Sequence, residues 1–69
     1  MKELDQLVKM ANQIAANFSF HSDGVQRLAD HLARFWAPAM RSQLQEYADT
    51  GGEGLDEMVR EALNTLKAA

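Results

Sequence analysis

The chain has 69 residues, enough for one domain, and no cysteine, so neither a disulfide nor a thiolate-bound metal can reinforce its core. Seven Lys and Arg residues against ten Asp and Glu give a formal net charge of −3, which disfavours nucleic-acid binding because that affinity depends on a basic face. No apolar run approaches the roughly 20 residues that span a bilayer, and the N-terminal residues lack a signal-peptide core, so we expect no membrane segment and a cytoplasmic protein.

Apolar residues recur at helical spacing through the first half of the chain. One stripe predicts an amphipathic helix over about residues 3–17, and a second predicts a helix over about residues 24–36. Asp23, followed by Gln26 three positions later, fits a capping box at the start of the second helix. The first stripe comprises Leu4, Leu7, Val8, Ala11, Ile14, Ala15 and Phe18, and the second comprises Val25, Leu28, Ala29, Leu32 and either Phe35 or Trp36.

The second half of the chain predicts two further helices. Pro38 disfavours helical geometry at the residue before it and suits a first helical position, so a third helix is expected over about residues 38–49. A glycine-rich segment at 50–54 is expected to be a flexible connection to a fourth helix over about residues 56–67. The predicted fold is therefore all-α, a small compact single domain over residues 1–69 built from three to four short amphipathic helices.

The joint between the second and third helices carries the only Trp and the only Pro of the chain, Trp36 and Pro38. Side chains of neighbouring helical residues point about 100° apart, so one core-facing stripe cannot hide both Phe35 and Trp36. We therefore expect the two aromatics to meet different surfaces and predict a docking site at the joint, with Trp36 in contact with the partner. The alternative is that Trp36 belongs to the core.

Three arginines are spaced seven residues apart, at Arg27, Arg34 and Arg41. Two interpretations remain open. Arg34 and Arg41 could form a basic ridge that binds partner carboxylates, since the guanidinium suits bidentate recognition. Alternatively, the arginines form a solvated face with internal pairs to Asp23, Asp30 or Glu46, which is the favoured interpretation for Arg27.

Other polar residues give few signs of chemistry. His21 and His31 lie ten positions apart with no carboxylate that completes a ligand set, so we expect a solvated loop residue and a residue at the core edge, respectively. No nucleophile constellation or phosphate loop is present in the sequence. Asn12 either faces water or makes a specific hydrogen bond, across an interface or to the loop before the second helix. Gln13 beside it is likewise a candidate for partner binding. We expect no catalytic, cofactor-binding or metal-binding residue in the chain.

Three runs in the chain are distinctive when taken in order. They are VKMANQIA at 8–15 followed by Phe18, HLARFWAPAMR at 31–41, and GGEGL at 51–55 followed by Val59, Ala62 and Leu63. Together they resemble the small delta subunit of NAD-dependent formate dehydrogenases over nearly the whole chain.

That resemblance implies a non-catalytic accessory subunit that aids assembly, stability or cofactor insertion in a multisubunit formate dehydrogenase. The implied partner is the large catalytic (alpha) subunit together with the other subunits, which would carry a molybdenum or tungsten pterin, iron–sulfur clusters, FMN and the NAD site. The residues predicted to bind the partner are Asn12, Gln13, Arg34, Phe35, Trp36, Pro38, Met40 and Arg41. The alternative function is a homodimeric helical interaction module unrelated to redox enzymes.

Overall fold

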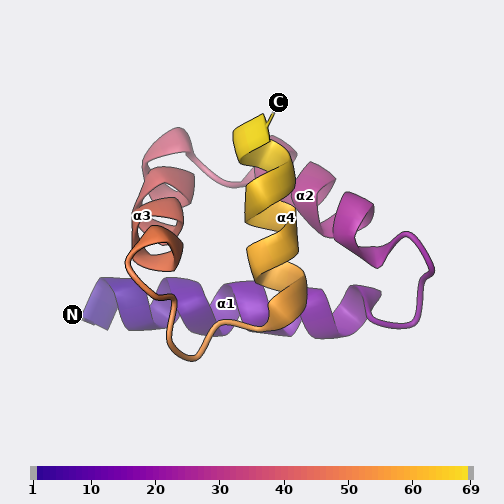
Figure 1. Ribbon diagram of the computed structural model, residues 1–69, viewed down its shortest axis with the longest axis horizontal. Helices are drawn as coiled ribbons and strands as arrows, with labels where there is room; N and C mark the ends of the chain where they lie inside the picture. Colours follow the sequence, from indigo (N-terminus) through magenta and orange to yellow (C-terminus); the bar gives the residue numbers. More distant parts are fainter. Residues whose placement is uncertain (1, 69) are drawn as a thin grey trace.

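The computed structural model describes residues 2–68, which form four helices joined by short connections (Figure 1). The all-α prediction is confirmed, and each helix differs from its predicted bounds by no more than one residue at either end. Within residues 2–68 no helix is long and apolar enough to cross a membrane. The helices are α1 (Lys2–Phe18), α2 (Gly24–Phe35), α3 (Pro38–Asp49) and α4 (Glu57–Ala68).

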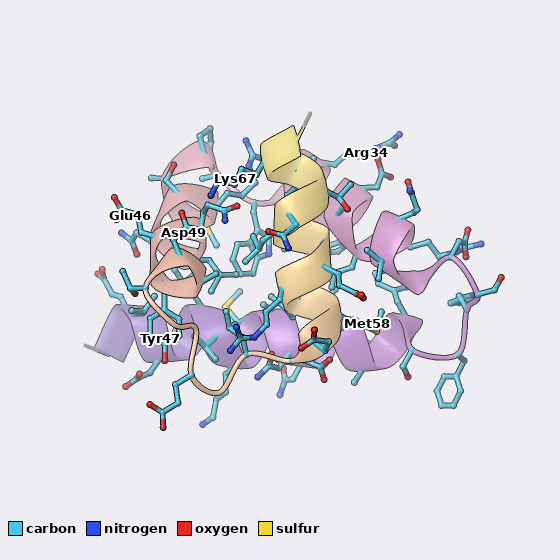
Figure 2. The ribbon with its side chains drawn as sticks, viewed as in Figure 1. Arg34, Glu46, Tyr47, Asp49, Met58 and Lys67 are labelled. Carbon is cyan, nitrogen blue, oxygen red and sulfur yellow. The ribbon has the colours of Figure 1, made fainter. Side chains whose placement is uncertain are left out.

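Helix α1 lies along the base of the molecule and touches each of the other three helices (Figure 1). The most extensive packing is between α2 and α4, whereas α3 touches α4 more lightly. An ion pair between Lys67 Nζ of α4 and Asp49 Oδ1 of α3, at 3.2 Å, links the two helices at the surface (Figure 2).

The core lies where the apolar faces of all four helices meet. Its largest fully buried side chains are aliphatic and come from α2, α3 and α4, while α1 contributes mainly small residues that let the other helices approach closely. Burial of this apolar surface is the main force that stabilises the fold. The buried set comprises Leu7, Ala11, Ala15, Leu28, Ala29, Leu32, Trp36, Leu44, Leu55, Val59, Ala62 and Leu63.

The turn between α1 and α2 depends on a glycine. A Cβ on Gly24 would lie 2.5 Å from the carbonyl oxygen of Phe18 and 2.8 Å from Cε of Met58, which Figure 2 shows at the foot of α4. The capping-box prediction is wrong, because the Asp23 side chain makes no capping hydrogen bond. Its Oδ1 instead accepts a 2.8 Å hydrogen bond from Nε of Arg27, and that bond lowers the pKa of Asp23 from its ordinary value.

The connection between α3 and α4 is more constrained than the flexible segment that we expected. Gly52 N–H donates to the carbonyl of Tyr47 and Gly51 N–H to that of Ala48, the hydrogen-bond pattern of a Schellman motif at the end of α3. Gly51 has a φ of 129°, which favours glycine. Nη2 of Arg60 donates to the carbonyls of both glycines, at 2.9 and 2.8 Å.

Asn12 ties the same connection to α1. Its Nδ2 donates to the carbonyl of Gly54 at 2.9 Å, and its Oδ1 accepts from the backbone N–H of Asp56, also at 2.9 Å. Asp56 in turn caps α4, since its Oδ1 accepts from the N–H of Met58 at 3.0 Å. The interpretation that Asn12 faces water is therefore wrong, and its hydrogen bonds are intramolecular. Both go to the α3–α4 connection, so the alternative of a bond to the loop before α2 is wrong as well.

We predict that Asn12→Asp destabilises the fold, because a carboxylate cannot donate to the carbonyl of Gly54. The expected loss in the free energy of unfolding is about 1–2 kcal/mol, measured by urea denaturation. The matched control, Gln13→Glu, makes the same amide-to-acid change at an exposed neighbouring residue and should shift stability by less than about 0.5 kcal/mol. Equal effects from the two substitutions would show that the Asn12 hydrogen bonds contribute nothing specific.

Candidate partner-binding surface

The joint between α2 and α3 is formed by two residues of extended backbone. Trp36 has φ −91° and ψ 138°, and Ala37 has φ −64° and ψ 147°. Ala37 cannot easily be helical because Pro38 follows it, and Pro38 then occupies the start of α3, as predicted. The chain thus leaves the helix after Phe35, one residue earlier than expected.

The two aromatics at the joint face different surfaces, as predicted, and Trp36 is the one that is buried. Trp36 is only 5% exposed and packs in the core, whereas Phe35 is 73% exposed. The extended backbone at Trp36 turns its indole inward, while Phe35, the last residue of α2, stays on the outer side of that helix. The prediction that Trp36 contacts a partner is corrected, since its side chain is not available at the surface of this fold.

The guanidinium of Arg41 makes intramolecular hydrogen bonds. Its Nη1 donates to three carbonyls at the end of α2, those of Leu32 at 3.1 Å, Ala33 at 2.8 Å and Trp36 at 3.0 Å. The last carbonyls of a helix lack intrahelical partners and carry the negative end of its dipole, so a guanidinium is well suited to this position. The basic-ridge interpretation is therefore wrong for Arg41, which joins α3 to α2.

The other two arginines form exposed pairs along α2. Arg27 contacts Asp23 at 2.8 Å, and Arg34 contacts Asp30 at 3.1 Å, each through Nε and each one helical turn apart. The interpretation of internal pairs is confirmed for both. The side chain of Arg34 is nevertheless 70% exposed and projects from α2 into solvent, so its guanidinium remains accessible to a partner (Figure 2).

Aromatic rings extend from Phe35 along the outer side of α2. His31 lies 4.8 Å from Phe35 and 6.1 Å from Phe18 between ring centroids, so it sits at the edge of the core, as expected. A hollow of about 230 Å³ lies between these rings and the Asp30–Arg34 pair. Sequence reasoning did not assign His31 to this surface, although its spacing of four residues from Phe35 would have placed the two side by side on a helix.

The structure brings together only part of the predicted partner-binding set. Arg34, Phe35 and Pro38 are exposed around the joint, and we refer to these three residues as the joint surface. Met40 is half-buried against the core, and Gln13 is exposed on α1, away from the joint in the sequence and on a different helix. Partner binding by these residues stays a prediction.

The joint surface offers apolar and hydrogen-bonding contacts without reactive groups. Within residues 2–68 no group of three or more His, Asp or Glu side chains could hold a metal ion, and the sequence has no cysteine. Thiolate ligation of an iron–sulfur cluster therefore does not fit this chain. The features described so far define a small helical protein with a candidate docking surface at one corner.

A family model described as the NADH-dependent formate dehydrogenase delta subunit FdsD matches residues 6–63. The match covers most of the chain and includes all of the joint, so the chain belongs to this family. No curated protein and no solved structure matches the chain. The resemblance expected from the three sequence runs is thereby confirmed at the level of the family.

We predict that Trp36→Ala costs about 3–5 kcal/mol of stability, because it empties the largest aromatic site of the core. Domains of this size rarely have more than about 3–5 kcal/mol in total, so the variant should be largely unfolded at 25 °C by circular dichroism. Phe35→Ala, the neighbouring control, should retain its helical signal and lose less than about 1 kcal/mol. A folded Trp36→Ala chain would contradict the core assignment.

We also predict that Arg41→Met destabilises the chain by about 1–3 kcal/mol, since three carbonyls at the end of α2 lose a charged donor. Arg34→Met removes only an exposed ion pair, an interaction worth about 0–1 kcal/mol, and serves as the control. Both variants keep an unbranched stem at the substituted position. Urea midpoints compare the two, and a shift for Arg34→Met as large as that for Arg41→Met would refute the proposed role of Arg41.

Proposed function

We propose that this chain is a non-catalytic accessory subunit that binds the large catalytic subunit of formate dehydrogenase and aids its assembly, stability or cofactor insertion. The membership of the chain in the delta-subunit family supports a role within that enzyme. The chemistry of the formate reaction would reside in the partners, because the side chains described above supply no ligand set for the cofactors. Molybdenum or tungsten pterin, iron–sulfur clusters, FMN and NAD would all be held by the other subunits.

The observation that carries the proposal is the exposure of Phe35 together with the accessible guanidinium of its neighbour Arg34. A Phe ring that is 73% exposed, on a chain with few large side chains, places apolar area in water at a site that the core does not use. Aromatic and arginine side chains are the residue types that most often dominate interface energetics. Phe35 with the accessible guanidinium of Arg34 beside it has the composition expected at the centre of a protein interface.

The proposal predicts that Phe35→Ala weakens binding to the catalytic subunit without unfolding the chain. Truncation of an aromatic at an interface centre costs roughly 2 kcal/mol or more, which corresponds to a loss of affinity of roughly thirtyfold. The dissociation constant can be measured by titration of the purified catalytic subunit with labelled chain. Phe20→Ala is a suitable control, because Phe20 is a 92% exposed phenylalanine in the α1–α2 turn.

Expression of the enzyme with and without the chain tests the role in assembly. Formate dehydrogenase expressed without the chain should contain less molybdenum or tungsten per catalytic subunit, or dissociate at lower temperature, than enzyme expressed with it. Unchanged metal content and unchanged thermal stability would refute the accessory role. A chain that forms a stable homodimer in size-exclusion chromatography and fails to bind any formate dehydrogenase subunit would instead favour the homodimeric module.

A further inference from the structure

A groove runs between α1 and α3, and its lining does not include the three residues of the joint surface. It consists of two neighbouring hollows of about 320 and 370 Å³ that share Glu3 of α1 and Gln43 of α3 among their lining residues. On α3 the lining extends from residue 39 to residue 47, with Thr50 just beyond the helix, and on α1 it extends from residue 3 to residue 10. The eight helical steps from residue 39 to residue 47 correspond to roughly 12 Å, so the groove is long enough for a short chain segment.

The lining of the groove is mainly apolar. Leu4 and Tyr47 contribute to one hollow, and Leu7, Met10 and Met40 contribute to the other. Met10 is 41% exposed, which makes it one of three large hydrophobic residues that the fold leaves open to solvent. Met is well suited to such a surface, because its unbranched, polarisable side chain adapts to different contacts. Two neighbouring hollows offer places for two apolar side chains of one segment.

The charged residues along the groove have the same sign. Among the described lining residues, the charged side chains are those of Glu3 and Glu46, and neither carboxylate belongs to an ion pair within the described part of the chain. Figure 2 shows Glu46 on the outer side of α3, away from α4. Carboxylates at a groove rim favour the approach of Lys or Arg and oppose acidic partners. The groove therefore combines apolar hollows with a negative rim.

We infer that the α1–α3 groove binds a segment of another formate dehydrogenase subunit in which apolar side chains are flanked by Lys or Arg. The apolar side chains occupy the two hollows, and the cationic groups pair with Glu3 and Glu46. This inference rests on the proposed function for the source of the segment. It adds a second contact on a face of the chain formed by α1 and α3, distinct from the contact at the end of α2.

Photo-crosslinking within the assembled enzyme tests the inference directly. Gln43 is exposed and borders both hollows, so Gln43→p-benzoylphenylalanine places a crosslinker at the centre of the groove. After co-expression with the other subunits and irradiation, mass spectrometry identifies the attached peptide. We expect a peptide from another subunit that contains apolar residues next to Lys or Arg. Asn64→p-benzoylphenylalanine, at an exposed position on α4, is the control and should give little crosslinking.

The possible outcomes distinguish a failure of the groove assignment from a failure of the proposed accessory role. A chain that co-purifies with the enzyme but gives no crosslink at Gln43, or crosslinks to an acidic segment, overturns the groove assignment and leaves the accessory role standing. A crosslink to a second copy of this chain also overturns the assignment. Failure of the unmodified chain to co-purify with any formate dehydrogenase subunit overturns both.

Two substitutions provide a second measurement on the same complex. Met10→Gln and Glu46→Lys should each weaken binding to the enzyme roughly tenfold, because the first removes apolar contact and the second places like charges in contact. Glu61→Lys makes the same charge reversal at an exposed position on α4 and should change the affinity less than about threefold. Equal losses for Glu46→Lys and Glu61→Lys would show a response to net charge alone and would contradict a rim contact.

Discussion

Two residues of extended backbone turn the chain between α2 and α3, and the indole of Trp36 fills the core at that turn. Three features make this turn possible. Pro38 excludes helical geometry at Ala37, and the extended Trp36 then directs its side chain inward. The guanidinium of Arg41 reaches back to the carbonyls that the end of α2 leaves without partners. The angle between α2 and α3, and with it the position of the exposed Phe35, depends on this group of residues.

Polar contacts hold together segments that are far apart in the sequence, as disulfides do in many proteins of this size. Asn12 joins α1 to the α3–α4 connection, and Arg60 of α4 binds the carbonyls of Gly51 and Gly52. Tyr47 adds a third contact to the same connection through its hydroxyl, which donates to the carbonyl of Glu53. Each interaction is modest in net energy, but together they offset the conformational entropy that the glycine-rich segment loses when it is ordered on folding.

The distribution of apolar residues is compatible with a protein that binds a larger partner. Most large side chains are used in the core, yet Met10 and Phe35 stay open to solvent on different helices. Single exposed hydrophobic residues are ordinary on protein surfaces. Met10, however, borders an apolar groove with an acidic rim. Phe35 lies beside the imidazole ring of His31 and the accessible guanidinium of Arg34. Two separate contact regions would let a short chain hold its orientation on a partner, which a single contact could not ensure.

The sequence by itself determined the four helices and the family, because helical periodicity and the proline signal are local properties that need no knowledge of the fold. It also showed that Phe35 and Trp36 would face different surfaces. The tertiary structure alone decided which of them is buried, since that depends on how far the chain turns after α2. It likewise decided the partners of Asn12 and Arg41, because residues more than forty positions apart, in the case of Asn12 and Gly54, meet only when the helices pack. The groove between α1 and α3 has the same origin, since each helix supplies only one of its two walls and one of its two carboxylates, Glu3 from α1 and Glu46 from α3.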